Sequence, residues 1–156
     1  MMRRQATKSG TDTGFTMLEL ITVLALVALA AGLVMPRLSA TRQNLKVKAL
    51  AVQLVSSLKM ARAAALKSNI DQALVVDVKG RRYWAEGSVP PKALPRDIAV
   101  SFEVAAGEAT GNGSQGRLRF RPDGTASGGK LKISSGTEAA LISVDWLTGN
   151  IALTWR

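Results

Sequence analysis

The residue whose position most clearly suggests chemistry is Glu19, a carboxylate inside an apolar run from Phe15 to Met35. An ionised acid within a bilayer costs about 2.5 to 3.5 kcal/mol on insertion scales, so it needs a charged partner or a place at the membrane boundary. Both interpretations are open from the residues alone. At the boundary Glu19 favours the positive end of a helix dipole, whereas within an assembly it pairs with a cation.

The apolar run is long enough to cross a membrane. At about 1.5 Å per helical residue, the stretch from Phe15 to Met35 spans about 30 Å, the thickness of a hydrocarbon core. Small residues at 28–31 could mimic a signal-peptidase site, but the run continues beyond them, which disfavours a cleaved secretory signal. Because basic residues precede the run, the positive-inside rule places the N-terminus in the cytoplasm. The sequence therefore predicts a single-pass anchor.

Composition excludes several common catalytic chemistries. The chain has 156 residues, no Cys and no His. Cys–His pairs, Ser–His pairs and the common zinc sites are therefore not available. We expect no enzymatic activity, no bound metal and no cofactor. The formal net charge of +10 suggests anionic partners, either nucleic acid or a membrane surface.

The residues around Glu19 carry a family resemblance. The order G-F-T-M-L-E at 14–19, after a short basic leader and before an apolar helix, resembles the class III signal of type IV pilins and type II secretion pseudopilins. In that family an inner-membrane prepilin peptidase cuts after the Gly and methylates the new N-terminus. The resemblance implies a leader of residues 1–14, cleavage between Gly14 and Phe15, and N-methylation of Phe15.

The same resemblance gives roles to two further residues. Glu19 is implied in assembly, where it pairs with the N-terminal ammonium of a neighbouring subunit, because a paired buried charge costs much less than a lone one. Pro36 matches the position of a helix-kinking Pro in similar pilins, and it lacks the N–H of an internal helical bond. The transmembrane and assembly helix is therefore expected at residues 15–36.

After the anchor, residues 37–69 predict an amphipathic helix. There is no Gly or Pro between Arg37 and Ser68, and apolar residues recur at steps of three and four. The predicted buried stripe consists of Leu50, Leu54, Leu58, Ala61 and Ala65. The opposite, solvated face is expected to carry Lys46, Lys48, Lys59, Arg62 and Lys67.

From Gln72 onward the apolar period changes to two, which predicts half-buried strands in a β-rich domain of residues 70–156. Hairpins are expected around 79–80 and 148–150, loops at 89–97 and 107–116, and a turn at the P-D-G of 122–124. Asp123 is expected to serve this turn rather than catalysis. Three tryptophans on predicted strands are expected to pack in the core or at sheet edges: Trp84, Trp146 and Trp155.

A second resemblance lies in the C-terminal half. The stretch FRPDGTASGG at 120–129, followed by LKIS and by SVDWLTGNIALTW, is similar to H-type minor pseudopilins and their type IV relatives, the GspH/FimT family. This resemblance implies an α+β, pilin-like fold, with a long N-terminal helix packed on antiparallel sheet. It also implies a structural subunit of the pseudopilus that serves protein secretion across the outer membrane.

The expected location and partners follow from the resemblance. The protein would be a single-pass inner-membrane protein with a cytoplasmic N-terminus and a periplasmic C-terminal domain. It would be assembled into the periplasmic pseudopilus. Its partners would be the other pseudopilins, major and minor, the prepilin peptidase and methyltransferase, and the inner membrane itself.

A basic strand face supports an alternative function. Arg117, Arg119 and Arg121 alternate on one predicted strand, and Lys130 and Lys132 alternate on the next. If these strands pair, the five cations form a patch that can engage phosphates. The alternative is a FimT-like minor type IV pilin that binds DNA for natural transformation, with nucleic acid as its partner. The other interpretation of this alternation is an ordinary solvated face.

Overall fold

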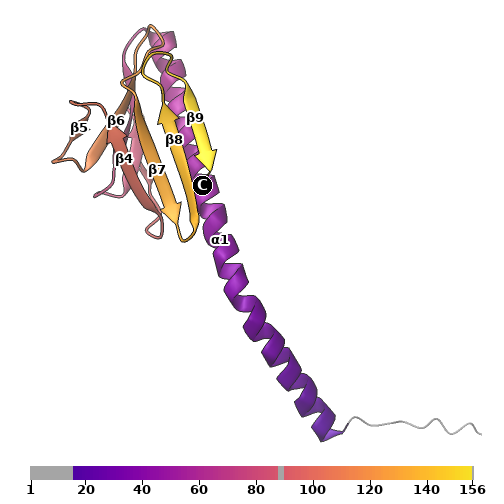
Figure 1. Cartoon of the computed structure of the whole chain (residues 1–156). Coiled ribbons are helices and arrows are strands. Elements are labelled where there is room, and N and C mark those ends of the chain that lie inside the picture. The colour runs from indigo at the N-terminus through magenta and orange to yellow at the C-terminus, as the bar shows by residue number, and fades with distance from the viewer. Residues whose placement is uncertain (1–15, 88–89, 156) are drawn as a thin grey trace, which may run out of the picture. The chain divides into compact units, whose positions relative to one another are not determined.

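The computed structural model describes residues 16–87 and 90–155. The chain divides into two compact units, Met1–Ser39 and Ala40–Arg156, which are considered separately below. Figure 1 shows the elements. Helix α1 covers Met17–Ser68, and among the described residues of the second unit nine strands follow it.

The first unit contains the beginning of α1. Thr16 lies just before the helix, and its hydroxyl oxygen accepts the N–H of Glu19 at 3.3 Å, as an N-cap does. The hydroxyl of Thr22 donates to the carbonyl of Leu18 at 2.8 Å. Beyond these residues the helix is apolar on all sides, and the large apolar side chains between Met17 and Leu29 are 52% to 84% exposed. Such a surface requires an apolar environment, which a bilayer or a helix bundle provides.

The second unit contains the remainder of α1, which packs by the predicted stripe. Leu50, Leu54, Leu58, Ala61 and Ala65 are all buried, and Val47 and Ala51 extend the stripe. The helix ends at Ser68, and the next residue, Asn69, has the left-handed φ of 57° that is common at helix C-termini.

Two residues of the expected solvated face make contacts to the strand domain. The Nζ of Lys46 lies 2.6 Å from a carboxylate oxygen of Asp97, and this hydrogen bond lowers the pKa of Asp97. Arg62 donates to the carbonyl of Thr148 at 2.9 Å. Lys46 nevertheless stays exposed, as expected, whereas Arg62 is half-buried, because helical periodicity does not show which distant loops come near.

The strands form a five-stranded sheet of order β3-β2-β1-β6-β5 and a four-stranded sheet of order β4-β7-β8-β9, and all pairs within them are antiparallel. Figure 1 shows β7, β8 and β9 as neighbouring arrows. The bounds are β1 Gln72–Asp77, β2 Arg82–Ala85, β3 Lys92–Ala93, β4 Ala99–Val104, β5 Ala109–Thr110, β6 Gln115–Phe120, β7 Gly129–Ser135, β8 Glu138–Val144 and β9 Ile151–Trp155.

Both predicted hairpins are confirmed. β1 and β2 are joined across residues 78–81, and β8 and β9 across 145–150. In the first hairpin, the carboxylate of Asp77 accepts the N–H of Gly80 at 2.7 Å. A Cβ atom at Gly80 would lie 2.3 Å from an oxygen of that carboxylate, so a larger residue there would displace the Asp77 side chain. The two expected loops differ in part, because each contains a two-residue edge strand, β3 or β5.

One hydrophobic core joins the helix and both sheets. Side chains from α1, from the five-stranded sheet and from the four-stranded sheet belong to the same buried cluster. The largest of its fully buried side chains are Tyr83 on β2 and Phe120 on β6. On β6 and β7 the inward residues include Leu118 and Leu131, and the alternate residues of these strands point away from the core.

Candidate functional site

The predicted processing and assembly residues differ in how far the structure describes them. Gly14 and Phe15 lie outside the described residues. Glu19 is in the first turn of α1, exposed, with its N–H held by Thr16. The backbone around Pro36 is helical, and a kink there stays a prediction.

The T-x-x-E spacing of Thr16 and Glu19 is the sequence signature of a helix N-terminus. The contact between Glu19 and Thr16 agrees with the boundary interpretation of Glu19, and the cap formed by Thr16 is the part that the sequence interpretation did not include. It means that Glu19 occupies a favourable place at the positive end of the helix even in an isolated subunit. A role in assembly would come in addition to this local one.

Two segments of α1 bear on membrane anchoring. Among the described residues, Asn44–Ser68 is long and apolar enough to cross a membrane, with a mean hydropathy of 1.3, but a third of its apolar window is buried in the second unit. The described part of the predicted anchor, Met17–Ala31, is a shorter apolar helix. Asn44–Ser68 contributes its apolar stripe to the core of the second unit, and an anchor at residues 15–36 stays a prediction.

The arginines of β6 form ion pairs on the outer face of the five-stranded sheet. Arg119 Nε lies 2.9 Å from a carboxylate oxygen of Glu108, and the other end of its guanidinium lies 3.5 Å from Asp71. Arg117 pairs with Glu86 and lies 3.9 Å from Glu108. Burial alone would lower the pKa of Arg119, but Glu108 and Asp71 outweigh it and raise the pKa. These two arginines are therefore already neutralised within the protein.

The predicted five-cation patch does not form. Strands β6 and β7 belong to different sheets, so Arg117 and Arg119 lie on one outer face, and Lys130 and Lys132 lie on the other. Arg121 follows the end of β6 and donates to the hydroxyl of Thr125 at 3.3 Å. The condition on which the DNA-binding alternative depended is not met.

The segment between β6 and β7 crosses from one sheet to the other, which explains why these two strands do not pair. The predicted P-D-G turn is confirmed, because Asp123 accepts the N–H of Thr125 at 2.8 Å and Gly124 has a φ of 87°. The side-chain hydrogen bond from Thr125 also lowers the pKa of Asp123. The chain then enters the other sheet at Gly129, where a Cβ atom would lie 2.6 Å from Leu118 and 2.7 Å from the carbonyl oxygen of Glu103. Only glycine permits this close passage.

One of the three tryptophans differs from expectation. Trp84 is half-buried on β2, where the guanidinium of Arg82 lies 5.5 Å from its ring centre. Trp155 is 43% exposed at the end of β9. Trp146 lies just beyond β8 rather than on a strand and is 65% exposed.

Among the described residues, no group of three or more Asp and Glu side chains is placed to hold a metal ion.

Comparisons with known proteins agree with this architecture. The chain is 26% identical over 138 residues to Type II secretion system protein H of Xanthomonas campestris pv. campestris, which covers 88% of this chain and 80% of that protein. The structure of the minor pseudopilin EpsH from the type 2 secretion system of Vibrio cholerae superposes with a TM-score of 0.56. That match covers 70% of this chain and 96% of EpsH at 16% identity, and it confirms the pilin-like α+β fold.

The family match covers the part of the chain that carries the core. The family described as Type II transport protein GspH matches residues 50–148, which include the buried stripe of α1 and most of both sheets. These comparisons give no support to a DNA-binding type IV pilin over a secretion protein. The family match extends over more than half of this chain. The chain therefore belongs to the GspH family of type II transport proteins.

Proposed function

We propose that this protein is a minor pseudopilin of a type II secretion system, a structural subunit of the pseudopilus that serves protein secretion across the outer membrane. The observation that carries the proposal is the family match over residues 50–148, on a domain that follows an exposed apolar helix. The role is mechanical rather than catalytic. The subunit is anchored in the inner membrane, leaves it on assembly, and packs into the growing pseudopilus beside major and minor pseudopilins.

Processing by the prepilin peptidase precedes assembly. The cut falls between Gly14 and Phe15, and Phe15 becomes the methylated N-terminus. Helix α1 begins at Met17 with Thr16 as its cap, so the bond to be cut lies just before the helix. This supports the proposal, because a protease binds its substrate in extended form. A helix around the scissile bond would have to unwind first.

Glu19 has a second partner in the assembled state. Cleavage converts the uncharged amide nitrogen of Phe15 into an ammonium group. In a bundle of apolar helices a lone charge is costly, and the nearest carboxylate that can neutralise it is Glu19 of an adjacent subunit. Glu19 is exposed, and its place in the first turn puts it close to the new terminus along the chain. Pro36 adds a kink that adapts the helix to this packing.

The orientation of the protein in the membrane follows from the positive charge of its leader. The leader is basic, so the N-terminus stays in the cytoplasm and the domain from residue 40 onward lies in the periplasm.

Mass spectrometry of the protein from cells that contain a type II secretion system tests the processing step. We expect an N-terminus at methylated Phe15, and replacement of Gly14 by Ala should leave the leader attached. An intact leader in the unsubstituted protein would refute the prepilin assignment.

A deletion strain tests the function itself. Loss of the gene should stop secretion of type II substrates, and the unsubstituted chain should restore it, whereas Gly14→Ala should not. Secretion that continues at the normal level in the deletion strain would contradict the proposed role.

A further inference from the structure

The turn between β5 and β6 contains an asparagine followed by a glycine, Asn112–Gly113. Asn112 has a φ of 54° and Gly113 a φ of 79°, and the N–H of Ser114 donates to the carbonyl of Gly111 at 3.2 Å. Two successive positive φ angles within such a bond are the pattern of a type I′ hairpin turn. Both Asn112 and Gly113 are exposed, so water reaches the side-chain amide and the backbone that follows it.

The backbone nitrogen of Gly113 is free to react with the side chain before it. Within the described part of the chain, neither the N–H of Gly113 nor the side chain of Asn112 makes a hydrogen bond to the protein. A Cβ atom at Gly113 would have no neighbour within 4 Å, so nothing crowds this nitrogen. Asparagine is also among the residues that are chemically labile in proteins.

Little holds the turn against the rotation that brings the two groups together. The turn is closed at the carbonyl of Gly111, which accepts the N–H of Ser114 and, at 2.7 Å, its hydroxyl. Rotation about the Cα–C bond of Asn112 moves the nitrogen of Gly113 toward the side-chain carbon Cγ and gives up these bonds. Glycine on both sides of Asn112 adds no side-chain hindrance to this movement.

We propose that Asn112 is a site of spontaneous deamidation. The nitrogen of Gly113 attacks Cγ of Asn112, the Cγ–Nδ2 bond breaks, and ammonia leaves with the proton of the Gly113 N–H. The product is a five-membered succinimide. Water then opens this ring at one of its two carbonyl carbons, which gives either aspartate or isoaspartate with one new carboxylate. The reaction consumes water alone, so it stands independently of the proposed function in secretion.

The isoaspartate product changes the backbone of the turn. It places an additional carbon in the main chain between β5 and β6, whose register pairs Ala109 with Gly116 and Thr110 with Gln115. Glu108 directly precedes β5, and one of its carboxylate oxygens lies 2.9 Å from Arg119 Nε. We therefore expect isoaspartate at position 112 to weaken the β5–β6 pairing and the ion pair beside it, whereas aspartate leaves the main chain unchanged.

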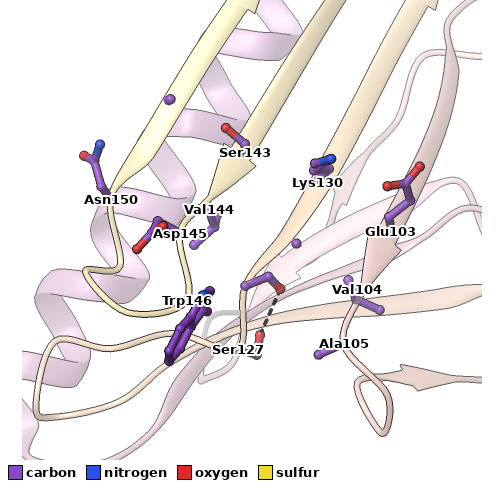
Figure 2. A pocket seen from close by; sticks show the side chains of 13 residues that line it. Glu103, Val104, Ala105, Ser127, Lys130, Ser143, Val144, Asp145, Trp146 and Asn150 are labelled. Carbon is purple, nitrogen blue, oxygen red and sulfur yellow. Dashed lines mark hydrogen bonds between the residues drawn. The ribbon is translucent and has the colours of Figure 1, made fainter.

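The other three asparagines serve as internal controls, because each is followed by a bulkier residue. Asn44 precedes Leu45 within helix α1, where the N–H of the next residue belongs to the helical hydrogen bonds. Asn69 precedes Ile70, and Asn150, seen at the start of β9 in Figure 2, precedes Ile151. A β-branched side chain crowds the attacking nitrogen, so these two sites should react much more slowly than Asn112.

Incubation of the folded, detergent-solubilised full chain in heavy-oxygen water tests the proposal. The tryptic peptide of residues 97–117 contains Asn112 and no other asparagine. We expect fragment spectra to place heavy oxygen at position 112 before it enters at the other asparagines, and faster at mildly alkaline than at mildly acidic pH, because base removes the amide proton. Deamidation during digestion in ordinary water carries no label. Isoaspartyl methyltransferase should methylate the labelled product, which identifies isoaspartate.

Two substitutions provide the matched variants. Asn112→Gln keeps the amide but requires a six-membered ring, so the label at position 112 and the methylation should be lost. Asn112→Asp has the charge of the product with an ordinary main chain. The isoaspartyl fraction, separated by cation exchange, should unfold at a lower temperature than Asn112→Asp, and an equal midpoint would contradict the expected weakening of the turn.

Two results would overturn the proposed site itself. The first is the absence of label at position 112 in the folded chain while the urea-unfolded chain acquires it there, because the turn would then block the reaction. The second is label that enters Asn69 or Asn150 as fast as Asn112, because the glycine would then have no effect. Either result leaves the proposed role in secretion unchanged.

Discussion

Replacement of Glu108 by Gln tests whether the ion pairs on the five-stranded sheet hold the arginines of β6. The side chain of Glu108 is 12% exposed, and one of its oxygens lies 2.9 Å from Arg119 Nε. A hydrogen bond to a charged group contributes about 1.5 to 3 kcal/mol. Because both arginine side chains are 29% to 30% exposed, water compensates part of the loss, and we expect a destabilisation of about 1 to 2 kcal/mol.

Thermal unfolding of the full chain in detergent, followed by the near-ultraviolet signal of its tryptophans, measures this loss. For a domain of about this size, 1 to 2 kcal/mol lowers the unfolding midpoint by about 4 to 8 °C. Glu138→Gln is the matched control, because Glu138 forms no ion pair among the described residues, and it should leave the midpoint nearly unchanged. If Glu108→Gln unfolds at the same temperature as the unsubstituted protein, Glu108 does not hold the two arginines and the proposed neutralisation is wrong.

Two further substitutions test the fold. Asp77 has a pKa below its ordinary 3.8, first because it accepts the Gly80 N–H and then because Arg82 is near. Its contribution to stability is present above about pH 4 and is lost as the pH falls through the lowered pKa, so acid should destabilise the unsubstituted protein more than Asp77→Asn in denaturant titrations at pH 7 and pH 3. Equal acid sensitivity would contradict this. Leu54 is fully buried, and Leu54→Ala should cost about 2 to 5 kcal/mol, whereas exposed Val52→Ala should change stability by less than about 0.5 kcal/mol in the same titration.

Local patterns predicted most of the secondary structure. The three- and four-residue steps of Leu50, Leu54 and Leu58 were sufficient to identify the buried face of α1, because a helix has only one way to bring such residues together. The turn residues around Gly80 and Gly124 located a hairpin and a turn for similar reasons. These features depend on residues that are close in sequence.

The predictions that were wrong concern contacts between residues that are distant in sequence. Period-two alternation correctly predicted that Arg117 and Arg119 face away from the core, but it does not show which strand lies beside β6. Its neighbours are β1 and β5, and the segments next to these supply Asp71 and Glu108. Trp146 was expected in the core or at an edge because aromatic residues favour strands. The carboxylate of Asp145 instead begins the turn one residue earlier.

The same alternation of charged residues therefore leads to different outcomes on two strands. On β6 the arginines find carboxylates that the fold brings from elsewhere in the chain, so their charge stabilises the domain. On β7, Glu103 is the acid that faces Lys130 in register, and the pair is not within ion-pair distance. Of the five cations that suggested a binding surface, Arg117 and Arg119 are thus the two that form ion pairs among the described residues. Alternation alone therefore does not distinguish a paired cation from an unpaired one, because the pairing carboxylates come from other elements of the fold.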